Sequence, residues 1–163
     1  MNTADLFDDF PAELSVCDLQ FRTFGKRRSF SGPCATVLTS EDHRPVLKAV
    51  STPGNGRVLV VDVAGSMRIG VMGDRLAAIA VANGWVGVVI NGLIRDSKAI
   101  DGLEIGVKCL GTTARRSEIE RGGLFDVVLH FGGVRFTPGA WVYADEDAVT
   151  TSEGKLEPLT CNN

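Results

Sequence analysis

The chain has 163 residues, a formal net charge of −3 at neutral pH, 44% hydrophobic residues and 23% charged residues. This balance is typical of one globular domain with a sizeable core, and the acidic charge excludes the basic footprint of a general nucleic-acid-binding protein. No apolar run is long enough for a membrane span, and the acidic start MNTADLFDDF lacks the features of a signal peptide. We therefore expect a cytoplasmic protein without a membrane partner.

The first quarter of the chain predicts short elements. Residues 1–20 favour one or two short helices with Thr3 and Ser15 as candidate caps. The run Cys34–Thr39 predicts a strand, and Pro45 is typical of the first turn of a helix, which should end near Ser51. The four cysteines match no zinc pattern, so we expect free thiols; they are Cys17, Cys34, Cys109 and Cys161.

The centre of the chain predicts a βαβ unit. Two apolar β-branched runs, Val58–Val63 and Val86–Ile90, flank a helical segment, Asp74–Asn83, and Gly84 stands where a helix commonly ends in glycine. The two strands should be parallel with a right-handed crossover. The polar segments that follow the strands should therefore meet at one edge of the sheet, where open α/β sheets bind ligands.

The second half is rich in short strands. Ser97–Leu103 predicts one helical turn, Gly106–Gly111 a strand, and the polar run Thr112–Gly123 an exposed loop or frayed helix. Further strands are predicted between Gly and Pro turns, at Asp126–Phe131, Val134–Phe136, Trp141–Ala144 and Ala148–Thr151. The sum is an α/β domain with a β-rich second half.

The first charged segment is Gly73-Asp74-Arg75-Leu76, at the start of the central helix. Unpaired backbone N–H groups and the helix dipole favour a carboxylate or phosphate there, and a glycine lets it approach closely. The alternative is that Asp74 simply caps the helix.

The second charged segment is Arg95-Asp96, after the second strand. An arginine can hold a carboxylate with two parallel hydrogen bonds, and a free carboxylate suits a hard divalent cation. The alternative is a surface ion pair between the two neighbours. Because both segments follow strands of one βαβ unit, their coincidence favours a small carboxylated substrate together with a metal.

The chain resembles the regulator of ribonuclease E activity A-like (RraA-like) family, which includes the class II 4-hydroxy-4-methyl-2-oxoglutarate aldolases. The matching pieces are Cys17-Asp18, Phe24-Gly25, Glu41-Asp42, GRVLVVD at 56–62, GSMRIGVMGD at 65–74, NGWVGVVINGLIRD at 83–96, IGVKCLGT at 105–112, FGGV at 131–134 and YADEDA at 143–148. The resemblance implies a swivelling β/β/α fold, one domain over 1–163 with a core at about 17–151, and a homotrimer with the site between subunits.

The resemblance also implies roles. Gly73, Asp74, Arg75 and Leu76 would bind the pyruvyl carboxylate of an α-keto acid, Arg95 the substrate, and Asp96 a divalent cation, Mg²⁺ or Mn²⁺. Retro-aldol cleavage into two pyruvates and decarboxylation of oxaloacetate pass through the same pyruvate enolate, which a metal and Arg95 would stabilise. Neither segment contains a histidine, so the general base stays open, with a metal-bound water as our hypothesis.

Three alternatives remain open. Some family members lack the acid after the arginine and regulate ribonuclease E without catalysis; Asp96 favours the enzyme. A Schiff-base aldolase would need a buried lysine, and Lys98 lies in a polar turn. A methyltransferase is suggested faintly by Val58–Asp62 followed by Gly65, although the G-x-G-x-x-G pattern is absent. His43 and His130 favour structural roles.

Overall fold

The computed structural model describes residues 2–158. The helices are α1 (Thr3–Asp9), α2 (Arg44–Val50), α3 (Asp74–Ala82) and α4 (Ser97–Ile100). The strands are β1 (Ser15–Val16), β2 (Arg22–Phe24), β3 (Phe30–Thr39), β4 (Val58–Asp62), β5 (Gly87–Ile94), β6 (Gly106–Thr112), β7 (Gly123–Phe125), β8 (Leu129–Phe131), β9 (Val134–Phe136), β10 (Trp141–Ala144) and β11 (Val149–Ser152). No helix among these residues is long and apolar enough to cross a membrane.

One mixed sheet organises the domain, in the order β1-β11-β10-β3-β4-β5-β6-β2, with β7 beside β3. Strands β3, β4, β5 and β6 are parallel neighbours, as the central βαβ unit predicted. Every residue of β4 and β5 is buried, which explains their continuous apolar runs: parallel strands covered on both faces need apolar side chains on both.

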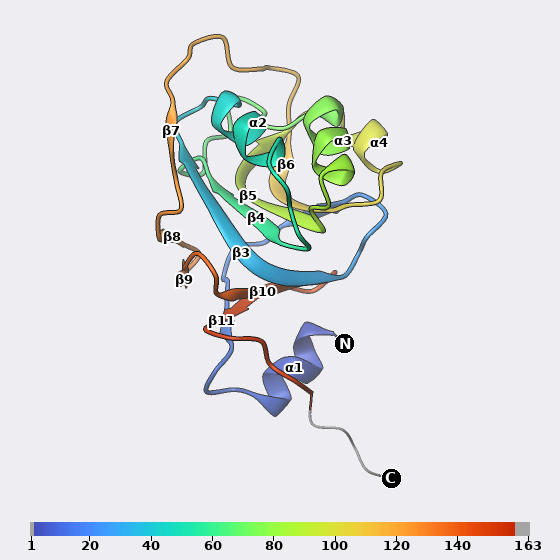
Figure 1. The fold of residues 1–163 in the computed structure, drawn as a ribbon, viewed down its shortest axis with the longest axis vertical. Helices are drawn as coiled ribbons and strands as arrows, with labels where there is room; N and C mark the ends of the chain where they lie inside the picture. Colours follow the sequence, from blue (N-terminus) through green and yellow to red (C-terminus); the bar gives the residue numbers. More distant parts are fainter. Residues whose placement is uncertain (1, 159–163) are drawn as a thin grey trace.

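Two apolar layers cover the two faces of the sheet. Helices α2, α3 and α4 lie together over one face, and Figure 1 shows them above β4 and β5. The core between them and the sheet includes Val61, Ala77 and Ile90, all fully buried. On the other face, a second core joins the sheet, its strand β10 included, to the β8–β9 hairpin, and this core includes Phe136 and Val142. The predicted α/β class, with its β-rich second half, is confirmed.

Strand β3 joins the two parts of the sheet. Its first residues, Phe30–Pro33, pair with β10 in antiparallel register, and Cys34–Leu38 pair with β4 in parallel register. The strand predicted at Cys34–Thr39 is therefore correct but four residues too short at its start, because the segment from 30 to 33 alternates in burial and contains Gly and Pro.

Several other boundaries differ from the predictions. Ser15–Val16 pairs with β11 instead of forming a helix, and α1 is capped by Asn2, whose side chain accepts the N–H of Asp5, while Thr3 bonds to Asp145. Of the strand predicted at Asp126–Phe131, only the last three residues form a strand, β8; β7 ends just before Asp126, which takes a left-handed conformation with φ 54°. Cys17, Cys34 and Cys109 are buried free thiols, as predicted; Cys161 lies outside the described residues.

Candidate functional site

The two charged segments of the βαβ unit meet at the carboxyl end of β5. The N–H of Val71 donates to the carbonyl of Leu93 at 3.0 Å, and the N–H of Arg95 donates to the carbonyl of Met72 at 2.8 Å. Residues 71 and 72 thus run beside the end of β5, which continues to Ile94 through the segment predicted as a loop. This pairing brings the start of α3 next to Arg95 and Asp96, as the sequence predicted.

Asp96 lies against the N-terminus of α3. The N–H of Asp74 donates to Asp96 Oδ2 at 3.4 Å, and Gly73, the residue before the helix, offers no side chain as a cap. A Cβ at Gly73 would lie 2.6 Å from Asp96 Oδ2, so only glycine leaves room for this carboxylate. The alternative that Asp74 caps α3 is not seen; the anion beside the helix terminus is the side chain of Asp96.

Arg95 has no carboxylate partner in the described part of the chain. None of the ion pairs among residues 2–158 includes it, and its Nε atom is buried without a hydrogen-bond partner in this part of the chain. Asp96 adopts a left-handed conformation with φ 54°, and its carboxylate meets the N–H of Asp74 instead of its neighbour. A surface ion pair between Arg95 and Asp96 is therefore excluded, and Arg95 keeps donors free for a ligand.

Two adjoining cavities share Asp74, Arg95 and Asp96. The larger, of about 940 Å³, is also lined by Ser97, Lys98, Ala99, Thr112, Thr113 and Ala114. The smaller, of about 140 Å³, is also lined by His43, by residues 70–73, and by Arg75, Leu76 and Arg116. All the residues that the sequence singled out thus line one continuous region.

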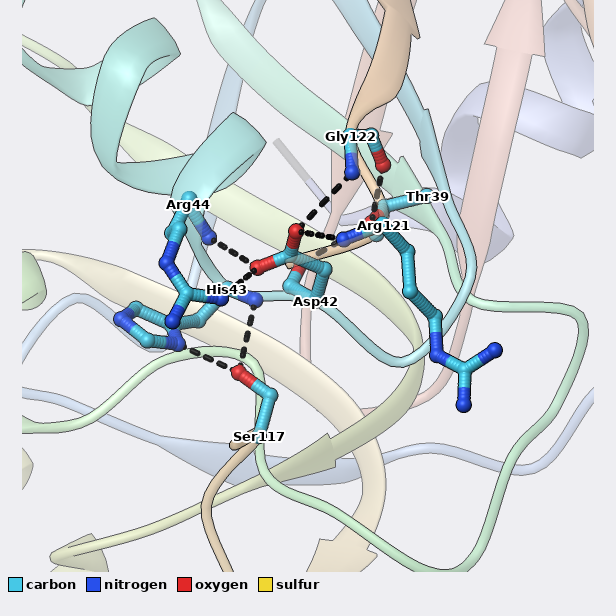
Figure 2. Close-up of polar contacts among 7 residues, drawn as sticks. All are labelled: Thr39, Asp42, His43, Arg44, Ser117, Arg121 and Gly122. Atoms are coloured by element: carbon cyan, nitrogen blue, oxygen red, sulfur yellow. Dashed lines mark hydrogen bonds and ion pairs between the residues drawn. The ribbon is translucent and has the colours of Figure 1, made fainter. Parts of the chain in front are cut away.

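His43 and Arg116 are two members of this region that the sequence did not place there. Gly70 donates its N–H to the carbonyl of Arg115 at 2.9 Å and forms a bridge with Arg116, which fixes the segment Thr113–Gly122 beside the site. His43, just before α2, contacts Ser117 of the same segment (Figure 2). The segment predicted as exposed loop is therefore one wall of the smaller cavity.

The donor set fits a hydrated cation. Among residues 2–158, no group of three or more His, Cys, Asp or Glu side chains is arranged around one point. Asp74 and Asp96 are the carboxylates of the cavities, and hard oxygens in this small number suit Mg²⁺ or Mn²⁺, which can keep most of their water ligands.

A family model described as "RraA-like: Aldolase/RraA" matches residues 3–151. The chain belongs to the RraA-like family. This membership confirms the resemblance drawn from the motifs, and the match covers both charged segments and all of the sheet except Ser152, the last residue of β11.

Curated relatives of this RraA-like chain are named as aldolases. Proteins of Xanthomonas campestris pv. campestris strain B100 and of Aromatoleum aromaticum are 48% and 46% identical over 154 residues, which cover 94% of this chain and 92% and 97% of theirs. Both are named "Putative 4-hydroxy-4-methyl-2-oxoglutarate aldolase".

Solved structures carry other names. One from Geobacillus kaustophilus, named S-adenosylmethionine:2-dimethylmenaquinone methyltransferase, is 51% identical with a TM-score of 0.93 and covers 96% of this chain and 97% of its own. The RNA-processing inhibitor RraA of Thermus thermophilis is 34% identical with a TM-score of 0.92 over 98% and 97% of the two chains. One RraA-like fold thus carries three functional names.

Proposed function

We propose that this protein is a divalent-metal-dependent aldolase that cleaves 4-hydroxy-4-methyl-2-oxoglutarate into two pyruvates and also decarboxylates oxaloacetate. The observation that carries the proposal is the meeting of Arg95, with its unpaired buried Nε, Asp96 and the N-terminus of α3 in one cavity region. The aldolase name of relatives at 46% to 48% identity supports the same activity.

The substrate's pyruvyl carboxylate would bind beside Gly73–Leu76. The first turn of α3 supplies backbone N–H groups and the positive end of the helix dipole, and the guanidinium of Arg95 supplies charge and directed donors. Arg116, which lines the same cavity, has no carboxylate partner among the ion pairs of residues 2–158 and is free to meet the second carboxylate of a dicarboxylic keto acid.

Asp96 would hold Mg²⁺ or Mn²⁺, largely through water ligands, with Asp74 as the nearby second carboxylate. When bound, such a cation supplies Lewis-acid polarisation of the substrate's keto oxygen. Gly73 keeps the space that the Asp96 carboxylate needs at the edge of the cavity.

Both reactions leave the same pyruvate enolate. In the aldol cleavage the bond between C3 and C4 breaks and its electron pair stays on the C2–C3 unit; in the decarboxylation the same pair is left when CO₂ departs. The positive charge of Arg95, half-buried beside the cavity, would stabilise the enolate oxygen, because a charge that is already held in position costs little reorganisation.

We also propose that the site is completed by a neighbouring subunit of a homotrimer. Large exposed apolar side chains support an interface: Met67 is 62% exposed, and Ile119, on the segment that forms the cavity wall, is 62% exposed. A regulator of ribonuclease E without catalysis is the second candidate function, and the name of the Thermus relative favours it.

The deciding experiment measures pyruvate from both keto acids with Mg²⁺, coupled to lactate dehydrogenase. The aldolase predicts that Asp96→Ala and Arg95→Ala each lower both activities at least about 10³-fold while the thermal unfolding midpoint changes little. EDTA should abolish activity and Mg²⁺ restore it. Wild-type protein that forms no pyruvate from either keto acid refutes the proposal.

Two further measurements address the alternatives. Sodium borohydride with pyruvate should leave the activity intact, because Lys98 is exposed and lacks the burial that a Schiff-base lysine needs. Binding of a ribonuclease E that is unchanged in Asp96→Ala, with no catalysis by the wild type, favours the regulator, and binding of labelled S-adenosylmethionine favours a methyltransferase.

A further inference from the structure

His43 is the imidazole in the wall of the smaller cavity. It stands at the entry to α2 and lines this cavity together with Arg95, Asp96 and Arg116. The other histidine of the chain, His130, is exposed on β8 and lines neither cavity.

Ser117 fixes the orientation of the ring. Its Oγ accepts the backbone N–H of His43 at 3.2 Å and lies 2.5 Å from His43 Nδ1. Figure 2 shows the second ring nitrogen, Nε2, pointing away from Ser117. Because a serine oxygen has two lone pairs, it can accept both the backbone N–H and Nδ1–H, and Nε2 then keeps its lone pair free for a ligand in the cavity.

Asp42 holds His43 and Ser117 together through the segments that carry them. It is fully buried, and its carboxylate accepts hydrogen bonds from the backbone and guanidinium of Arg44, both at 3.0 Å, and from the N–H groups of Arg121 at 2.7 Å and Gly122 at 3.0 Å. One carboxylate thus ties the start of α2 to the wall segment that carries Ser117 (Figure 2). A ring held by this network is positioned before any ligand arrives.

The surroundings favour the neutral imidazole. Burial lowers the pKa of His43, and the charges of Arg44, Arg116 and Arg95 lower this pKa further, against the opposing effect of Asp42. The remaining charged groups that face the cavity are Asp74, Arg75 and Asp96. A dianionic substrate would raise the pKa of the ring again, which suits a group that must take up a proton during the reaction.

Resting on the aldol cleavage proposed above, we propose that His43 is the general base of that reaction and Ser117 its positioning residue. Nε2 takes the proton of the C4 hydroxyl, the O–H electron pair becomes the C4 carbonyl, and the C3–C4 bond breaks to leave the enolate of pyruvate. The imidazolium then returns the proton to C3, so the two products are pyruvates and His43 ends neutral. No co-reactant is consumed.

This assignment separates two activities that share an enolate. Oxaloacetate has no hydroxyl to deprotonate, so its decarboxylation does not need the base. His43→Asn keeps an amide that can donate to Ser117 but cannot take up a proton. It should lower kcat for aldol cleavage by about 10²–10⁴-fold and that for decarboxylation less than about tenfold. His130→Asn is the matched control and should leave both activities at wild-type levels.

Two more readouts test the mechanism. The acid limb of the wild-type kcat/KM profile for aldol cleavage should lie below pH 6.5, since the pKa of His43 is lowered from that value, and this limb should disappear in His43→Asn. Ser117→Ala should lower the aldol activity, and Ser117→Thr, which keeps the hydroxyl, should restore most of it.

Each outcome decides one question. Equal losses of both activities in His43→Asn would give His43 a structural role only, and an unchanged aldol activity would place the base elsewhere; either result overturns this proposal and leaves the aldolase standing. A wild type without either activity refutes the aldolase itself.

Discussion

Replacing Asp42 with asparagine should destabilise the protein and loosen the wall segment Thr113–Gly122. The aspartate accepts four hydrogen bonds through two oxygens, Oδ1 from Arg44 and Oδ2 from Arg121 and Gly122. Asparagine keeps one oxygen and replaces the other with an NH₂ group. The two N–H groups that donate to one of the aspartate oxygens would then face the NH₂ group, which cannot accept them, in a fully buried position.

The size of the effect follows from the ionisation of Asp42. Burial raises its pKa, but the hydrogen bonds from Arg44, Arg121 and Gly122 outweigh burial and lower the pKa from 3.8 to about 2. This difference corresponds to about 2 kcal/mol of stabilisation at neutral pH. Backbone N–H groups left without an acceptor add about 1–3 kcal/mol, so Asp42→Asn should lower the free energy of unfolding by about 3–5 kcal/mol.

The ionisation of Asp42 also sets how the stability depends on pH. The folded-state pKa of Asp42 is below the unfolded value, so its contribution is complete above about pH 4 and is lost as the pH falls from 3.8 toward 2. The difference in unfolding free energy between wild type and Asp42→Asn should therefore shrink over that range. Urea unfolding at pH 7 and at pH 3 measures it.

Trypsin offers a direct test of the wall segment, because Arg115, Arg116 and Arg121 are all exposed. Cleavage there should be faster in Asp42→Asn than in the wild type, since two of the bonds that hold the segment end on Asp42. Glu120→Gln removes a charge from the same segment and should change neither stability nor cleavage. An Asp42→Asn protein within about 0.5 kcal/mol of the wild type and cut no faster would refute the reasoning.

Two other variants probe the cavity itself. Gly73→Ala places a Cβ 2.6 Å from Asp96 Oδ2, and it causes no backbone strain because φ is −117°. This variant should weaken Mn²⁺ binding and lower both activities about tenfold or more. Gly154→Ala is the control: the space around Gly154 is open, so neither Mn²⁺ binding nor activity should change. Arg116→Ala should raise KM for dicarboxylic keto acids about tenfold or more, with a smaller effect on kcat. Arg115 lines neither cavity, so Arg115→Ala should leave this KM unchanged. Equal KM values in the two variants would contradict a carboxylate contact by Arg116.

The half of the site that the sequence predicted is local. A βαβ unit places the ends of its strands at one edge of the sheet whatever the rest of the chain does, so Gly73–Leu76 and Arg95–Asp96 had to meet there. The finer arrangement was not predictable. Whether Asp96 turns toward Arg95 or toward α3 depends on its left-handed conformation and on the space at Gly73, which pattern alone does not reveal.

The other wall of the smaller cavity depends on contacts between distant parts of the chain. Asp42 and Gly122 are 80 residues apart, and His43 and Ser117 are 74 apart. The polar composition of 112–123 favoured solvent exposure, and most of its side chains are exposed. The position of this segment is fixed instead by backbone N–H groups that donate to one buried carboxylate. Such bonds cannot be predicted from hydrophobic periodicity.

The motif Glu41-Asp42 indicated the family but not the structural role of its two carboxylates. The match to the family did not predict a chemical role for either residue. In the structure Glu41 bonds to Ser66 of the segment after β4, and Asp42 bonds to the wall segment. Two adjacent carboxylates therefore tie the entry of α2 to the segment after β4 and to the wall segment, and His43 is the next residue along the chain. These bonds hold the backbone at the entry of α2 even when Ser117 Oγ is absent, which is why the loss of that oxygen should reduce the action of His43 as a base without abolishing it.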